Sequence, residues 1–326
     1  MVVDFLIYFF VFSISFLSSF FLIKILRKKN VLDFPNQRSN HVTPVPRGGG
    51  IAVLLAIIVG YIGSTYNAIP MPTPYILYAM IGLAVVSFID DIRNINILMR
   101  LSIQLICCYF MVEMLFPEFL FFAGVFPPVI DKFFVTILWV GFINAFNFMD
   151  GINGISFIET ASITIGFILL SFYFQMPNMS TQFAAIILFA TSGFVFWNFK
   201  NKIFLGDVGS VPLGFVLGFL LLELWQQVSC TFALILPLYY LADTSFTMIK
   251  RFINGEKIWQ AHSQHFYQRA FRQSKSKKKV LSIILIGNVA LISSCFLRNI
   301  FLCLAIAFIV VIMQLFFLIN LKAYKK

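Results

Sequence analysis

The chain has 326 residues, of which 60% are hydrophobic and 11% charged. Soluble domains average roughly 45–50% apolar and about 25% charged residues, so this composition excludes an ordinary soluble protein. The net charge of +11 is explained by membrane orientation and by attraction to anionic lipids, and not by a nucleic-acid-binding surface. All five cysteines fall inside apolar segments without metal-ligand spacing, so we interpret them as packing residues.

Successive apolar segments are long enough to cross a bilayer as helices, which takes about 20 residues each. They predict an all-α polytopic membrane protein that forms a single domain over residues 1–326. In chain order, the eleven expected transmembrane helices cover residues 5–26, 48–66, 75–89, 99–116, 133–149, 155–174, 181–198, 209–225, 228–249, 280–297 and 299–320.

The basic residues predict the orientation of these helices, because cytoplasmic loops retain Lys and Arg. If the N-terminus is outside and the C-terminus cytoplasmic, all of the 24 Lys and Arg except Lys132 and Arg298 lie on the cytoplasmic side. We interpret the basic run at 275–279 as a solvated cluster beside the membrane. The cytoplasmic loops that should carry the chemistry lie near residues 27–50, 90–100, 144–154, 199–210 and 250–279.

Five aspartates lie at the cytoplasmic ends of helices that are far apart in sequence. Ionisable groups at membrane depth are costly and usually face a cavity or a partner, so these positions are candidates for function. The candidates are Asp90, Asp91, Asp150, Asp207 and Asp243. Scattered counterions on a cationic face are the alternative explanation.

Asp90 and Asp91 are adjacent, and like charges held together either share a metal ion or raise one pKa enough to create a base. The alternative is a pair of helix-end acids neutralised by Arg93 and Arg100. Such a pair would oppose the helix dipole.

Asn144, Asn147 and Asp150 recur at every third residue and can therefore line one face of a helix. Gly151 and Gly154 then permit a tight turn. A simple helix-terminating turn would also use Asp, Gly and Asn, but it would not explain two asparagines inside the apolar segment.

Asp207 stands between Gly206 and Gly209, just before an apolar helix. The glycines let the backbone approach a ligand, and the first helical turn offers donors to a phosphate. A helix N-cap is the alternative for Asp207. For Asp243, a structural hydrogen bond and a direct role in the site both remain open.

His262 and His265 stand three residues apart and share a face if their segment is helical. This spacing is weak evidence for zinc, because further Cys or His ligands are missing. Two imidazoles beside Arg269 suit a diphosphate instead, and an ordinary loop is the alternative. Arg47 precedes three glycines at 48–50 that open a helix, where close helix packing is an equal explanation.

Taken together and in this order, these motifs resemble the polyprenyl-phosphate N-acetylhexosamine-1-phosphate transferase family. The matching segments are residues 46–50, 90–91, 144–154, 204–210, 243 and 262–269. The resemblance implies transfer of a sugar 1-phosphate from a UDP-N-acetylhexosamine to undecaprenyl phosphate, with release of UMP. It implies Mg²⁺ or Mn²⁺ as cofactor and an active site at the cytoplasmic face of the bacterial inner membrane. Mg²⁺ favours carboxylate and phosphate oxygens, as a site rich in Asp would supply.

The resemblance also implies roles for individual residues. Asp207 would be the metal ligand, and Asp90 or Asp91 would act on the lipid phosphate as a base or by positioning it. Asp150, with Asn144 and Asn147, would line the uridine or metal side of the cleft. His262 and His265 would contact the diphosphate or sugar phosphate, with Arg269 nearby. The remaining substrate-binding candidates are Arg47, Asn153 and Asp243.

Two departures from the family pattern affect these expectations. Many members have Asp where this chain has Asn153. The histidine segment, His-x-x-His-x-Tyr-Gln, looks more like the O-antigen and capsule initiators than the peptidoglycan enzyme. The donor sugar stays open between UDP-GlcNAc and deoxy relatives such as UDP-FucNAc or UDP-QuiNAc. Direct attack and an aspartyl intermediate both stay open, as does the oligomeric state, with a homodimer among the alternatives.

Two other classes of function compete with an enzyme that initiates lipid-linked glycan synthesis. A transporter or flippase with a carboxylate site would usually place its charges near the bilayer midplane and often shows an internal repeat. Here the acids gather at one face and the sequence shows no repeat. An inactive scaffold for glycan assembly is disfavoured by the intact set of aspartates.

Overall fold

The computed structural model is almost entirely helical, in agreement with the expected fold class. It describes residues 2–35, 43–93, 95–176, 178–257, 259–260 and 262–322. Parts of the expected loops 27–50, 90–100 and 250–279 therefore lie outside the described residues. The long helices are α1 (Val2–Lys28), α2 (Gly50–Tyr66), α3 (Tyr75–Arg93), α4 (Ile97–Leu115), α5 (Pro128–Met149), α6 (Ile155–Tyr173), α7 (Asn178–Phe199), α8 (Asp207–Gln227), α12 (Lys277–Ser294) and α13 (Ile300–Ile319).

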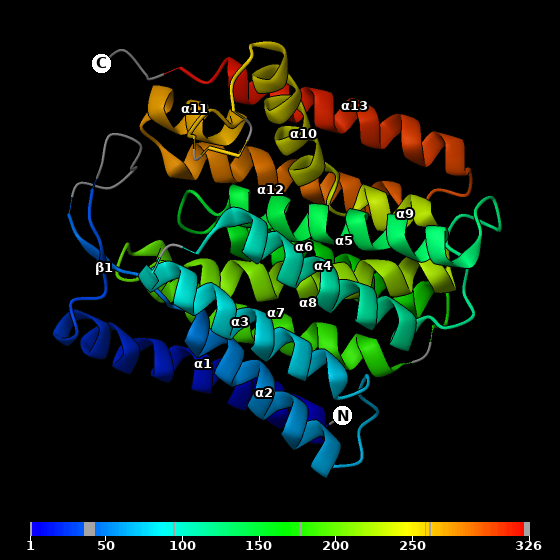
Figure 1. The fold of residues 1–326 in the computed structure, drawn as a ribbon, viewed down its shortest axis with the longest axis horizontal. Coiled ribbons are helices and arrows are strands. Elements are labelled where there is room, and N and C mark those ends of the chain that lie inside the picture. The colour runs from blue at the N-terminus through cyan, green and yellow to red at the C-terminus, as the bar shows by residue number, and fades with distance from the viewer. Residues whose placement is uncertain are drawn as a thin grey trace.

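Three shorter helices and one small sheet complete the described chain. The helices are α9 (Cys230–Ile235), α10 (Leu238–Ile253) and α11 (Phe266–Ser274). Strands β1 (Leu32–Asp33) and β2 (Val45–Pro46) pair antiparallel, with Leu32 opposite Pro46. Figure 1 shows the long helices running roughly side by side, with β1 and α11 at the same end of the bundle as the end of α1.

Eight of the described helices are long and apolar enough to cross a membrane, and α2 is a shorter apolar helix of 17 residues. The chain is thus a multi-pass membrane protein. The single helix expected over 228–249 is wrong, because the structure divides this segment between α9 and α10. Pro237 separates the two helices, since proline has no N–H to continue the hydrogen-bond ladder.

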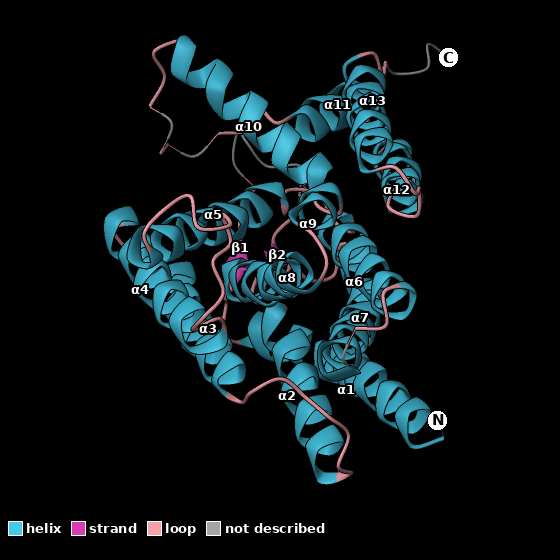
Figure 2. Cartoon of the chain, turned by 90° about the vertical axis from the view of Figure 1, so that its right-hand side faces the viewer, coloured by secondary structure: helices cyan, strands magenta, loops and turns pink. Residues whose placement is uncertain are grey.

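Helix α8 forms the centre of the bundle. Figure 2 shows it end-on, surrounded by α2, α3, α5, α6 and α7. In its apolar window, 89% of the residues are buried, against 22% in α1 and 33% in α13. The outer helices instead expose large apolar side chains such as Phe5 and Phe301, as expected for surfaces that face lipid. The position of α8 holds its first residue, Asp207, at the middle of one end of the bundle.

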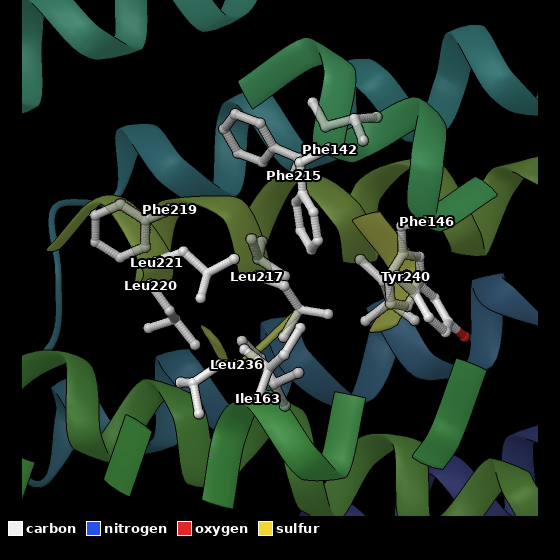
Figure 3. Close-up of a cluster of buried hydrophobic side chains, with 14 of the residues drawn as sticks. Phe142, Phe146, Ile163, Phe215, Leu217, Phe219, Leu220, Leu221, Leu236 and Tyr240 are labelled. Carbon is white, nitrogen blue, oxygen red and sulfur yellow. The ribbon is translucent and has the colours of Figure 1, made fainter. Parts of the chain in front are cut away.

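Aromatic and aliphatic side chains from several helices fill the space around α8. Figure 3 shows Phe142 and Phe146 of α5, Phe215 of α8 and Tyr240 of α10 in one buried cluster. Trp139 stacks on Phe215 with ring centroids 4.8 Å apart, and its indole N–H donates to the Phe215 carbonyl at 3.0 Å. This packing joins the middle of α5 to α8.

A buried polar cluster joins the last two helices to the bundle. Asn288 of α12 donates to the Glu159 carboxylate of α6 at 2.8 Å and to the Ser162 hydroxyl at 3.1 Å. Gln314 of α13 donates to the Asn288 side-chain oxygen at 3.4 Å. Within lipid, small and polar side chains of this kind supply much of the specificity of helix pairing.

Candidate active site

Arg47 is held at one end of the bundle by a short backbone ladder between two distant segments. The Phe204 N–H donates to the Pro46 carbonyl, and the Gly49 and Gly50 N–H groups donate to the carbonyls of Phe204 and Leu205, all at 2.8 Å. The pairing joins the glycine-rich segment at 48–50 to the loop that leads into α8. It places the Arg47 side chain over Asp207.

The glycines of both segments are explained by close packing at this junction. A Cβ on Gly50 would lie 2.1 Å from the Gly209 Cα, so α2 and α8 could not approach as they do with any other residue at 50. Gly206 has φ +75° and Gly48 has φ +116°, which L side chains rarely adopt. Close packing therefore explains Gly49 and Gly50, whereas the positive φ explains Gly48.

Two carboxylates from different helices meet at Arg47. The Nη2 atom of Arg47 lies 2.8 Å from the Asp91 Oδ1 of α3 and 2.8 Å from the Asp207 Oδ1 of α8. The other Asp91 oxygen accepts a hydrogen bond from the Val208 N–H at 3.3 Å. Burial lowers the pKa of Arg47, but Asp207 and Asp91 raise it more, so the guanidinium stays charged.

A second arginine links Asp207 to Asp90. Arg100 of α4 lies 2.6 Å from the Asp90 Oδ2 and 3.4 Å from the Asp207 Oδ2. Asp90 also accepts the Ile95 N–H at 2.7 Å, which fixes the turn between α3 and α4. The neutralisation of Asp90 by Arg100, considered from the sequence, is thus present. The structure nevertheless brings Asp90, Asp91 and Asp207 into one network.

The polar residues near the end of α5 divide between two environments. The Asn147 Oδ1 accepts a hydrogen bond from the Ser210 hydroxyl at 2.6 Å, which links α5 to α8. The Asn144 Nδ2 donates to the Gln104 Oε1 of α4 at 2.7 Å, deeper in the bundle. Asn147 and Asp150 line the main cavity, whereas Asn144 does not.

Asp150 follows the last residue of α5 and accepts a hydrogen bond from the Ser156 hydroxyl. Burial raises the pKa of Asp150 from its ordinary value of 3.8 to about 7; the Ser156 hydrogen bond opposes this shift, and the charge of Asp207 adds to it. Asp150 can therefore exchange a proton near neutral pH.

Asn153 belongs to a group of three amides at the cavity wall. It donates to the Asn201 side-chain oxygen at 2.6 Å and accepts from the Asn198 amide at 3.1 Å. Asn198 also accepts the Gly154 N–H at 2.8 Å. An ionised aspartate at 153 could not make the donation to the Asn201 oxygen that Asn153 makes here.

The histidine segment is not helical at His262, which corrects the expectation of a shared helix face. The helix α11 begins at Phe266 with His265 as its N-cap. The two imidazole centroids still lie 4.8 Å apart. Burial, followed by the charges of His265 and Arg251, lowers the pKa of His262 to about 4, so this ring is neutral at physiological pH.

Asp243 anchors the start of α11 from within α10. It is fully buried, and its Oδ1 lies 3.0 Å from both the His265 Nδ1 and the Phe266 N–H. Its Oδ2 accepts from the Tyr267 N–H and the Tyr239 hydroxyl, each at 3.2 Å. Asp243 and His265 do not line the main cavity. We interpret Asp243 as a positioning residue.

Some of these groups line a polar cavity of about 320 Å³ at one end of the bundle, whereas Asp90, Asp91 and His262 are not among its lining residues. Its walls include several candidates from the sequence, namely Arg47, Asn147, Asp150, Asn153 and Asp207. Sequence reasoning did not select the other polar residues of the wall, which are Asp33, Asn198, Asn201, Gln268 and Lys277. Arg269 lines a separate pocket.

Lys277 was missed because it lies within the basic run at 275–279, which the sequence presents as uniform. Its ammonium group donates to the Phe199 carbonyl at 2.5 Å and to Asn201 at 3.1 Å. No local signal separates it from Lys275 or Lys278. Lys277 reaches the cavity wall because of where α12 begins and how the loop after α7 is placed.

The geometry fits a divalent cation that is shared with a bound phosphate. No group of three or more His, Cys, Asp or Glu side chains that could hold a metal occurs among the described residues. Mg²⁺ is commonly held by one or two carboxylates together with waters and substrate phosphates. Asp91 and Asp207, which converge on one cationic nitrogen of Arg47, supply such a pair.

Comparison with known proteins identifies the relatives of this chain. Residues 73–225 match the sequence model of glycosyl transferase family 4. The family resemblance is confirmed. A probable undecaprenyl-phosphate N-acetylglucosaminyl 1-phosphate transferase of Bacillus subtilis is 29% identical over 89% of this chain and 84% of its own length.

Two further relatives represent different members of the same group. An undecaprenyl-phosphate alpha-N-acetylglucosaminyl 1-phosphate transferase of Escherichia coli K12 is 27% identical over 88% of this chain and 81% of its own length. A phospho-N-acetylmuramoyl-pentapeptide-transferase of Staphylococcus saprophyticus is 27% identical over 69% of this chain and 76% of its own length. The segment that matches the family model includes Asp90, Asp91, Asp150 and Asp207.

Proposed function

We propose that this protein transfers an N-acetylhexosamine 1-phosphate from a UDP-sugar to undecaprenyl phosphate and releases UMP. The donor would carry GlcNAc or a deoxy relative such as FucNAc or QuiNAc. The reaction would begin the synthesis of a lipid-linked surface glycan such as an O-antigen. The names of the relatives support the reaction class. The observation that carries the proposal is the convergence of Asp91 and Asp207 on Arg47 beside a polar cavity.

The proposed site lies at the cytoplasmic face of the bacterial inner membrane. The loops that line the cavity belong to the side that holds nearly all basic residues in the orientation with the N-terminus outside. At this boundary a soluble nucleotide sugar and the phosphate of a membrane lipid can meet. Basic residues on the same face would also attract anionic lipids.

In this proposal, Asp207 and Asp91 hold Mg²⁺ or Mn²⁺ on the substrate diphosphate. The bound metal would neutralise charge on the phosphoryl oxygens. Arg47 and Arg100 are then free to pair with phosphate oxygens in place of the carboxylates that they contact here. Asn147, Asp150 and the amides at 153, 198 and 201 form a polar wall suited to the uridine or the sugar.

We propose direct attack by the lipid phosphate, because it is already an anion near neutral pH. Its oxygen would form a bond to the phosphorus attached to the sugar, and the bond from that phosphorus to the bridging oxygen of UMP would break. The protein contributes mainly alignment and charge neutralisation, which dominate phosphoryl transfer in general. Asp90 and its partner Arg100 would position the acceptor.

The test is transfer by purified protein supplied with undecaprenyl phosphate, Mg²⁺ and a panel of radiolabelled UDP-N-acetylhexosamines. We expect a labelled lipid product with one preferred donor, and we expect it to be lost when EDTA is added. Folded protein that forms no lipid product with any donor would contradict the proposal. Flux of substrate across vesicles without turnover would support a transporter instead.

A further inference from the structure

A second pocket lies between α10 and α11 and shares no lining residue with the main cavity. It has a volume of about 220 Å³, several times the roughly 30 Å³ that one water occupies in the liquid. Three of its six lining residues are cationic and none is acidic. The residues are Thr247, Lys250, Gln264, Phe266, Arg269 and Arg272.

The two acids nearest in sequence to this pocket already have several partners, among them the pocket residues Thr247 and Gln264. Asp243 is fully buried, and its oxygens contact His265 and the first N–H groups of α11. Glu256 pairs with Arg251 at 2.9 Å and accepts from Gln264 at 2.9 Å. Among the described residues, neither acid forms an ion pair with Lys250 or Arg269. The positive charge of the pocket therefore favours an external anion.

The surface of α10 beside the pocket indicates where that anion comes from. Phe246, Ile249 and Ile253 are 51%, 56% and 76% exposed. Lys250 lies on the same stripe of the helix, because residues three and four apart are neighbours. Figure 2 shows α10 extending away from the ring of helices around α8. Apolar side chains interleaved with a cation are typical of a helix at the membrane interface.

We propose that this pocket binds the phosphate group of an acidic membrane phospholipid, with its acyl chains along the apolar face of α10. Arg269 and Arg272 of α11 and Lys250 of α10 would pair with the phosphate, and the second N–H of the Gln264 amide would supply a further hydrogen bond. A bound headgroup would join α10 to α11, the helix that carries Gln268 in the wall of the main cavity. The proposal depends on membrane insertion and not on the transfer reaction.

The experiment measures lipid binding to the detergent-purified protein by native mass spectrometry, with phosphatidylglycerol and phosphatidylcholine compared. We expect the wild type to prefer phosphatidylglycerol on the order of tenfold or more, because each basic residue near an anionic headgroup adds to the binding free energy. The triple variant Lys250→Gln, Arg269→Gln, Arg272→Gln should lose this preference. The matched control Lys275→Gln, Lys278→Gln, Lys279→Gln removes the same charge outside the pocket and should keep it.

Lys250→Met provides a second test that preserves folding, because Lys250 is exposed and Met keeps its apolar stem. It should weaken phosphatidylglycerol binding, but by less than the triple variant does. An equal loss in the control triple variant would contradict the proposal and indicate a diffuse surface charge. If millimolar inorganic phosphate displaced all of the bound phosphatidylglycerol, the pocket would be a site for free phosphate and not for a lipid headgroup. Unchanged phosphatidylglycerol binding with weaker binding of undecaprenyl phosphate would assign the pocket to the acceptor instead.

Discussion

Asp150 links the protonation of the site to the stability of the fold. Because burial raises its pKa from 3.8 to about 7, the folded protein holds a proton between these pH values that the unfolded chain has released. Its contribution to stability is therefore full below about pH 4 and falls as pH rises towards 7 and above. The slope from one such group is at most about 1.4 kcal/mol per pH unit.

We expect the melting temperature of the substrate-free wild type to fall from pH 5 to pH 8 more steeply than that of Asp150→Asn. The asparagine keeps an acceptor for the Ser156 hydroxyl but cannot titrate. Differential scanning fluorimetry of both proteins over this range checks the expectation. Parallel pH profiles would show that Asp150 does not take up a proton on folding.

Single residues also show how far sequence reasoning could reach. The period of three at Asn144, Asn147 and Asp150 placed polar groups near the end of α5, but only Asn147 and Asp150 line the cavity, and Asp150 lies just beyond the helix. Asn198 and Asn201 carry no such signal, since their partners Asn153 and Lys277 belong to segments distant in sequence. Contacts made across loops depend on the assembled bundle and cannot be derived from spacing.

At the level of elements, the junction of α2 with α8 allows a test within one helix. Gly50→Ala places a methyl group against the Gly209 backbone, which cannot move aside as a side chain could. We expect a loss of about 1–3 kcal/mol of stability, together with reduced transfer, because Arg47 and Asp207 lie at this junction.

Gly63→Ala in the same helix is the matched control, because nothing lies within 4 Å of its added Cβ. It should leave stability unchanged or raise it by roughly 0.5–1 kcal/mol. Thermal unfolding and transfer rates of the two variants provide the comparison. Equal behaviour would show that the close approach of α2 and α8 is not required.

The attachment of α11 to α10 depends on Asp243. Asp243→Ala leaves the His265 ring and the N–H groups of Phe266 and Tyr267 without their acceptor, at a cost of about 1–3 kcal/mol for each unpaired donor. We expect faster hydrogen–deuterium exchange over residues 262–274. Thr247→Val, which loses only one 3.4 Å hydrogen bond, should change little. Unaltered exchange in Asp243→Ala would show that the anchor is dispensable.

The same region shows where prediction of elements failed. Apolar content over 228–249 suggested one transmembrane helix, but Ser229 caps α9 and Pro237 precedes α10. Both are recognisable helix-boundary residues, so the break could have been expected from the chain. The direction of α10 could not have been predicted from the chain, because this direction depends on the contacts of α10 with α5 and α13.

On the scale of the whole molecule, the distribution of basic residues makes a prediction about orientation. In a background without the native cysteines, Lys275→Cys should react with an impermeant thiol reagent only after the cytoplasmic side is opened. Ala68→Cys, in the exposed turn after α2, should react in intact cells. The reverse pattern would invert the topology and place the cavity outside.

The bundle as a whole was more predictable than its site. Nine of the eleven expected spans correspond to the separate long helices α1–α8 and α13, and a tenth corresponds to α12, because a helix must satisfy its own backbone in lipid. The convergence of Asp90, Asp91 and Asp207 was suggested only by their common membrane face. Their pairing with Arg47 and Arg100 required the central placement of α8.

The central claim is that Asp207 performs its role through the charge of its carboxylate. Its most direct test is single-turnover transfer by Asp207→Asn at saturating Mg²⁺, beside Glu118→Gln as a control acid on an exposed loop. We predict a rate lower by on the order of 10³-fold or more for Asp207→Asn, with an unchanged melting profile, and a normal rate for the control. A near-normal rate for Asp207→Asn would contradict the proposed metal and phosphate site.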